Sequence, residues 1–168
     1  MEAMMPPGIP PILLFRTFAR NLPMTKAMGE WGSYELSKRC SLSMREREIV
    51  IDRTCARCGC EYEWGVHVAF YADRVGFSNQ QITSLTHGSA SDACWTEERD
   101  RILIDAVDEL FESAQISDQL WQRLKDILSD QQILDVLLMT GWYHAICFAA
   151  NGTHLALEPG VPRFADVA

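Results

Sequence analysis

The stretch that decides the fold is E-I-V-I-D-R-T-C-A-R-C-G-C-E-Y-E-W-G-V-H, residues 48–67. Gly59 lies near its middle, and a glycine just past the last turn of a helix adopts, at little cost, the left-handed conformation that ends the helix. We therefore expect one helix to end here and a second helix to begin at Cys60. The stretch predicts a helix–break–helix unit around which the chain is organised.

The second of these helices carries three reactive side chains on one predicted stripe: Cys60, Glu63 and His67. Residues three, four and seven apart share a helical face, so Glu63 and His67 are expected to touch. Free backbone N–H groups and the positive end of the helix dipole favour a thiolate at Cys60. Glu48 faces the same stripe if the two helices pack together. Any one of these residues alone is typical of ordinary structure, so the cluster is what indicates a site.

Length and composition bound the class of protein. The 168 residues suffice for one domain with a real core, and the 48% apolar and 23% charged content is that of a globular chain. The net charge of −8 argues against a nucleic-acid surface, which needs clustered Lys and Arg.

The six cysteines and the ends of the chain indicate a compartment. No secretion signal is visible in M-E-A-M-M-P-P-G-I-P-P, residues 1–11, so the cysteines indicate reduced thiols in the cytoplasm. The longest apolar region, residues 133–150, is interrupted by Asp135 and His144 and is not expected to span a membrane.

Helix signals run along the whole chain. Capping boxes begin at Ser43, Ser78 and Ser129, each with Glu or Gln three residues later, and Thr96 is a further candidate cap. The predicted helices cover residues 11–21, 24–38, 44–58, 61–75, 78–86, 96–111, 118–128 and 130–150. No segment alternates as a strand does, so the expected fold is all-α, a single domain of about eight helices over residues 11–168. A proline-rich arm, residues 1–10, is expected to precede it, and an extended tail begins at His154.

The residues resemble a known superfamily. R-E-R-E-I-V-I, residues 45–51, and R-C-G-C-E-Y-E-W-G-V-H, residues 57–67, resemble the alkylhydroperoxidase D-like (AhpD-like) and carboxymuconolactone decarboxylase superfamily. The late L-E-P-G-V-P-R-F, residues 157–164, is similar to the tail of one branch. The resemblance implies an AhpD-like helical bundle without an organic cofactor. It also implies a homo-oligomer, which is a dimer, a trimer or a multiple of these.

The two branches of the superfamily place different chemistry on this stretch. In the peroxidase branch a Glu precedes, by eleven intervening residues, C-x-x-C-x-x-x-H, which places Glu48, Cys60 and His67 on the motif. Glu63 stands where that branch has its second Cys, the one that attacks peroxide. In the decarboxylase branch a carboxylate lies four residues before the same histidine, as Glu63 lies before His67.

Thiol-dependent reduction of hydroperoxides, a peroxiredoxin-type activity, is the first hypothesis, and the density of thiols at the helix start favours it. A Cys60 thiolate attacks a peroxide oxygen and becomes sulfenic acid, while His67, positioned by Glu48 or Glu63, moves the protons. An external thiol or one of two nearby cysteines resolves the sulfenate: Cys58 or Cys55. Tyr62 and Trp64 flank this site and are candidates to line a pocket.

Two alternatives remain beside it. The first is cofactor-free acid–base chemistry on a small carboxylated lactone or related ring, in which Glu63 and His67 share a proton and His67 protonates the carbanion left by carbon dioxide. Glu48 orients His67, and the nearest cations for an anionic substrate are Arg53 and Arg57. The second is a non-catalytic or zinc-held module, with four possible ligands: Cys55, Cys58, Cys60 and His67. The peroxidase and decarboxylase hypotheses need no metal.

Overall fold

The structure, a computed structural model, describes residues 10–167, and every regular element within them is a helix. The eight α-helices and two 3-10 helices of this part are α1 (Leu13–Phe18), η2 (Ala19–Asn21), α2 (Leu22–Glu35), α3 (Met44–Arg57), α4 (Glu61–Tyr71), α5 (Asn79–His87), α6 (Glu98–Ser113), α7 (Asp118–Ile127), α8 (Asp130–Gly152) and η3 (Phe164–Val167). The prediction of an all-α fold of about eight helices is confirmed. Apart from Pro10, the arm expected at residues 1–10 falls outside the described residues, and the homo-oligomer stays a prediction.

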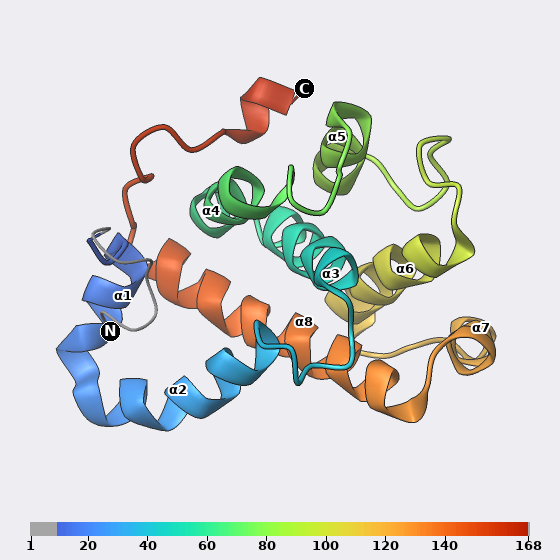
Figure 1. The fold of residues 1–168 in the computed structure, drawn as a ribbon, viewed down its shortest axis with the longest axis horizontal. Coiled ribbons are helices and arrows are strands. Elements are labelled where there is room, and N and C mark those ends of the chain that lie inside the picture. The colour runs from blue at the N-terminus through green and yellow to red at the C-terminus, as the bar shows by residue number, and fades with distance from the viewer. Residues whose placement is uncertain (1–9, 168) are drawn as a thin grey trace.

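The central element is α3. It packs against α4, α5, α6 and α8, and Figure 1 shows it in the middle of the bundle. Its residues from Glu46 to Cys55 are all buried, including Glu48, Asp52 and Arg53. Buried charged groups need partners or must become neutral, so the polar residues of this helix mark the part of the core where chemistry is to be sought.

Local capping sets the starts of three helices. The side chains of Ser43, Ser78 and Ser129 each accept a hydrogen bond from the backbone N–H three residues on, and the Glu or Gln there bonds back. These three predicted capping boxes are confirmed. Thr96 is not a cap, because α6 begins one residue later with Glu97 at its N-cap.

The predicted break between α3 and α4 is confirmed at Gly59, whose φ is +59°. The Cys60 N–H donates to the Cys55 carbonyl at 2.9 Å, and the Gly59 N–H donates to the Ala56 carbonyl at 3.0 Å. This pair of bonds is the Schellman arrangement, which satisfies the last carbonyls of a helix. The sequence around Gly59 therefore turns the chain sharply, and α4 returns against α3.

Several helix limits differ from those expected by a few residues, and two of them have a clear local cause. Asn21 caps α2, its side chain accepting from the Met24 N–H, so that helix begins at Leu22 rather than at residue 24. The fourth helix ends at Tyr71 rather than at residue 75, because a turn follows it and closes at Gly76, where φ is +70°. That turn carries Arg74 back toward the N-terminal helices.

The chain after α8 straps the N-terminal helix to the core. Glu158 Oε1 accepts a hydrogen bond from the Tyr62 hydroxyl at 2.6 Å and another from the Leu13 N–H at 2.5 Å. Further on, the Phe164 ring packs on Trp64 with 5.0 Å between ring centroids. Figure 1 shows this segment running from beside α1 across α4 toward α5.

The longest helix, α8, is long and apolar enough to cross a membrane, judged by length and composition alone. Its most apolar 18-residue window has a mean hydropathy of 1.5, and 50% of that window is buried inside the fold. A core helix of this length has the same properties. The buried half packs against α2, α3, α4, α6 and α7.

Candidate active site

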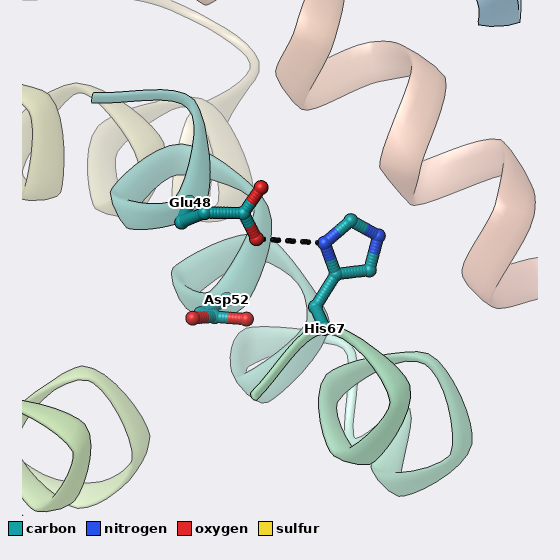
Figure 2. A group of neighbouring side chains, drawn as sticks. All are labelled: Glu48, Asp52 and His67. Carbon is teal, nitrogen blue, oxygen red and sulfur yellow. Dashed lines mark hydrogen bonds and ion pairs between the residues drawn. The ribbon is translucent and has the colours of Figure 1, made fainter. Parts of the chain in front are cut away.

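The site is built from two facing side chains, one from α3 and one from α4. Glu48 and His67 are both buried, and His67 Nδ1 lies 2.8 Å from Glu48 Oε2. Figure 2 shows the carboxylate pointing at the imidazole edge. A histidine held in this way by a carboxylate has a fixed ring orientation, with Nδ1 occupied and Nε2 presented to the other side.

Glu63 lies at that other side. It is one helical turn before His67 on α4, and its Oε1 is 3.6 Å from His67 Nε2. The second oxygen of Glu63, Oε2, is buried and has no hydrogen-bond partner in the described part of the chain. The structure thus brings Glu48, Glu63 and His67 together, as the helical spacing predicted, with one imidazole between two carboxylates.

These two carboxylates decide the charge of the imidazole. Burial by itself would lower the pKa of His67, but the Glu48 and Glu63 carboxylates outweigh it and raise that pKa well above the ordinary value. His67 is therefore an imidazolium near neutral pH. Its Nε2–H is a proton donor beside Glu63.

Asp52 extends this polar group behind Glu48. It lies one turn along α3, fully buried, and its Oδ1 has no partner among the described residues. Burial, followed by the charge of Glu48, raises the pKa of Asp52 well above its ordinary range, while His67 opposes the shift. Burial thus favours the protonated form of Asp52.

The same residues form the only potential metal-binding trio found within residues 10–167. One donor atom from each of Glu48, Asp52 and His67 lies within 4.8 Å of the others. The Glu48 and His67 donor atoms also hydrogen-bond one another.

A cavity of about 220 Å³ opens onto His67 and Glu63. It lies between α1 and α2 on one side and α4 and α8 on the other. Its walls are mostly apolar and aromatic, and include Leu14, Phe18, Met28, Tyr71, Trp142, Tyr143 and Ile146. The Tyr143 ring meets the His67 ring edge-on with 5.2 Å between centroids. A mostly apolar cavity with a few convergent polar groups is typical of a small-molecule site.

The cation of this cavity is Arg74, and the two arginines expected from the sequence are elsewhere. Arg74 is exposed in the turn after α4 and lines the cavity, with its guanidinium 5.6 Å from the Tyr71 ring centroid. Arg53 instead binds Asp108 through two 2.7 Å contacts, and Arg57 pairs with Glu112 at 2.9 Å. The expectation that Arg53 or Arg57 faces the substrate is therefore wrong.

Cys60 does not join the acid–base group. It is 0% exposed and does not line the cavity. The physical reason is its position as the N-cap of α4, where φ is −94° and ψ is 77°, so the helical spacing that relates Glu63 to His67 does not extend back to it. Its side chain is buried in the core instead.

The other predicted site residues lie on the same side as Cys60 or in the core. Cys55 is buried, with its sulfur 3.8 Å from that of Cys147, and Cys58 is half-buried at the end of α3. The zinc set that combined these cysteines with His67 is not formed by the described residues, because His67 bonds Glu48 on the far side of α4.

Tyr62 and Trp64 are structural in this fold rather than part of the cavity wall. The Tyr62 hydroxyl donates to Glu158 and accepts from the Leu14 N–H at 3.0 Å, and Trp64 is sealed beneath Phe164. Neither lines the 220 Å³ cavity, so the expectation that they line it is wrong.

Four residues of interest were not singled out from the sequence. Asp52 follows Glu48 by four positions on a predicted helix, so the one-turn spacing was a usable signal for it. Arg74, Tyr143 and Cys147 carry no local signal, because only the packing of α8 and of the turn after α4 brings them to the site or to the thiols.

Comparisons with known proteins agree with the fold. A model of the carboxymuconolactone decarboxylase family matches residues 23–104. No curated protein matches the chain significantly. Among solved structures, the chain is similar to an uncharacterized peroxidase-related protein from Silicibacter sp. TM1040, with a TM-score of 0.80 and 19% sequence identity over 97% of this chain and 84% of that chain.

The fold and the site define a small all-α protein with a buried Glu–His–Glu group at the base of an apolar cavity. Residues 23–104 match the carboxymuconolactone decarboxylase family, and the chain shares the fold of that peroxidase-related protein.

Proposed function

We propose that this protein is a cofactor-free acid–base enzyme that transfers a proton at carbon on a small carboxylated lactone or a related ring. The observation that carries the proposal is the placement of His67 and Glu63 on the cavity wall while Glu48 holds the far side of the imidazole. The thiol expected to attack peroxide lies outside that cavity. The family match, whose members include a decarboxylase of a carboxylated lactone by name, supports the same class of reaction.

The proposed step begins with the imidazolium. A substrate carboxylate leaves as carbon dioxide, and the electron pair of the broken carbon–carbon bond stays on the ring as a carbanion or enolate. His67 Nε2–H gives its proton to that carbon, and water returns a proton to the imidazole afterwards. Glu48 and Glu63 keep His67 charged before the step, so a proton is available near neutral pH.

The cavity fits a substrate of this kind. Its apolar walls exclude water from the ring and from the departing carboxylate, which strengthens charge interactions inside. Arg74, at the exposed rim, offers a cation to an anionic substrate on a protein whose net charge is −8. We therefore assign proton transfer to His67, its positioning to Glu48, and substrate anchoring to Arg74.

The experiment measures carbon dioxide release from carboxymuconolactone and related carboxylated lactones, together with deuterium incorporation into the product in heavy water. Wild type and Cys60→Ser should turn substrate over equally, whereas His67→Gln should lose about 10²–10⁴-fold in rate, the usual contribution of a general acid. Arg74→Gln should raise KM more than it lowers kcat. Full activity in His67→Gln, or loss of activity in Cys60→Ser, would overturn the proposal.

Thiol-dependent reduction of hydroperoxides is the second candidate, and one observation favours it. A hydrogen bond from Cys147 lowers the pKa of Cys60, burial opposes this, and the backbone N–H groups of Glu63 and Tyr62 add to the lowering. We rank this candidate second because Cys60 is fully buried. Ellman titration before and after one equivalent of hydroperoxide decides between the candidates. Consumption of a thiol in wild type but not in Cys60→Ser would support peroxidase activity. An unchanged number of free thiols in wild type would rule that activity out.

Two further properties belong to the proposal. We propose a reducing, cytoplasmic location, which the six free cysteines support. We also propose a homo-oligomer, as the resemblance implies, and α8 offers an apolar outer face on which Leu134, Leu138 and Phe148 are exposed.

A further inference from the structure

One hydroxyl of the cavity wall has no role in the proton transfer proposed above. Tyr143 of α8 lines the cavity, only 3% of it is exposed, and its ring packs edge-on against the His67 ring. Its hydroxyl makes no hydrogen bond to residues 10–167, and it is not one of their sealed polar atoms. The hydroxyl therefore opens on the cavity, on a ring that packs against the imidazole.

Other tyrosine hydroxyls of this fold have partners within it. Tyr62 donates to Glu158 at 2.6 Å. Tyr34 of α2 donates to Asp135 at 2.8 Å. A buried hydroxyl normally has such a partner, because leaving a polar group unpaired away from water costs free energy. Phenylalanine would fill the apolar space around Tyr143 equally well, so its hydroxyl serves a molecule in the cavity rather than the fold.

Two other hydrogen-bonding side chains of the wall are placed differently. The Thr25 hydroxyl donates to the Phe18 carbonyl at 2.5 Å, so it is used within the N-terminal helices. Arg74 lies at the exposed rim, where water competes for its guanidinium. Tyr143 is instead a buried, uncharged donor beside His67, the group that delivers the proton.

The surroundings of Tyr143 keep its hydroxyl protonated. Burial, and then the carboxylates of Glu63 and Glu48, raise the pKa of Tyr143 well above its ordinary value. The phenol therefore acts as a hydrogen-bond donor and not as a base. A fixed donor in apolar surroundings stabilises a developing negative charge strongly, because bulk water is excluded there.

We propose that Tyr143 is a further catalytic residue: its hydroxyl donates a hydrogen bond to the substrate oxygen that gains negative charge when carbon dioxide leaves. The carbon–carbon bond to the departing carboxylate breaks, and its electron pair is delocalised onto a carbonyl oxygen of the ring as an enolate. The proton of Tyr143 stays on the phenol throughout. The electron pair then returns to carbon, which takes the proton of His67 Nε2. The substrate class is therefore a ring acid whose carbonyl is conjugated with the carbanion that forms.

The catalytic step rests on the proposed function, but the binding of an oxyanion by Tyr143 is measured without turnover. A suitable probe is para-nitrophenol, because its phenolate presents one oxyanion on a flat ring and absorbs visible light. Nitrobenzene is the matched ligand, with the same ring and no phenolic oxygen. Tryptophan fluorescence reports the binding of both, since Trp142 lies in the cavity wall.

Tyr143→Phe removes the donor and keeps the ring. We expect it to weaken binding of para-nitrophenolate about 10–100-fold, the usual size of a hydrogen bond to a charged group, and to leave the affinity for nitrobenzene unchanged. Tyr34→Phe, the matched control, removes a hydroxyl outside the cavity and should bind both ligands as wild type does. The midpoint of urea unfolding should fall in Tyr34→Phe, which loses a bond within the fold, and should not fall in Tyr143→Phe.

The same variants are then compared on carboxylated lactones. Tyr143→Phe should lower kcat about 10²–10³-fold, as removal of one oxyanion donor does, and change KM much less. An equal loss of both ligands, an unchanged affinity for para-nitrophenolate, or full turnover in Tyr143→Phe would overturn the role of Tyr143. Absence of turnover in wild type would instead overturn the proposed function, and the comparison of the two ligands would still decide whether Tyr143 binds an oxyanion.

Discussion

His67 lies between two carboxylates in a buried position, and this sets a measurable property of the ring. Its pKa is raised well above the ordinary imidazole value by Glu48 and Glu63. A raised folded-state pKa means that the stabilisation from protonated His67 is complete below about pH 6.5 and is lost as the pH rises through the folded-state value.

The first prediction concerns that titration. Nitrogen–proton correlation spectra should show His67 protonated at neutral pH in wild type, with its signal assigned by loss in His67→Gln. Glu48→Gln removes the nearest negative charge and should lower the pKa of His67 more than Glu63→Gln does, since Glu48 makes the shorter contact. A wild-type pKa at or below about 6.5 would contradict this account of the site.

Among the site residues, the sequence predicted the contacts that arise within one helix or between two consecutive helices. Glu63 and His67 lie close together because they are one helical turn apart, and Glu48 contacts His67 because α3 and α4 pack together. Cys60 was placed on the same stripe in error, since an N-cap residue is not yet helical. Cys147, 92 positions from Cys55 along the chain, is brought to within 3.8 Å of the Cys55 sulfur only by tertiary packing.

Among the elements, the turn at Gly59 has the clearest requirement for its residue. Its φ of +59° lies in the left-handed region, and an added Cβ would meet nothing within 4 Å. A side chain at this position would therefore destabilise the fold only through the backbone, because the left-handed conformation costs a non-glycine residue about 1–2 kcal/mol.

The second prediction compares two glycines on that basis. Gly59→Ala should lower the free energy of unfolding by about 1–2 kcal/mol in urea titrations. Gly141→Ala, in the interior of α8 with open space for a Cβ and no positive φ, should raise it by roughly 0.5–1 kcal/mol. Equal effects of the two substitutions would mean that the turn relaxes and does not require glycine.

Elements were predicted best where their ends are set locally. The capping boxes at Ser43, Ser78 and Ser129 each use one side chain and one backbone group within a single turn, so the sequence specifies them. The end of α4 at Tyr71 and the start of α2 at Leu22 depend on a turn and on a cap that the periodicity of apolar residues does not reveal.

For the molecule as a whole, the segment after α8 completes the cavity indirectly. Glu158 accepts from the Leu13 N–H and the Tyr62 hydroxyl, so it fastens α1 to α4. Leu14 and Phe18 of α1 in turn form part of the cavity wall. The sequence predicted a tail beyond His154, and a single carboxylate in it holds α1 in place.

The third prediction tests this strap. Glu158→Ala should leave the Leu13 N–H and the Tyr62 hydroxyl without their acceptor and cost about 1–3 kcal/mol, the usual penalty for lost partners of buried polar groups. Hydrogen exchange measured by mass spectrometry should show faster exchange in α1 (Leu13–Phe18) and little change in α6. Glu112→Ala, which removes a surface ion pair with Arg57, is the control, and unchanged protection of α1 would show that the strap is unnecessary.

The position of Glu158 in the chain has a consequence for biosynthesis. A polypeptide leaves the ribosome from its N-terminus, and its early segments begin to fold while later ones are still being made. Helix α1 emerges first, but the carboxylate that anchors it emerges only after α8. A nascent chain therefore cannot enclose a ligand until translation has passed residue 158, which separates acquisition of the helical scaffold from acquisition of binding competence.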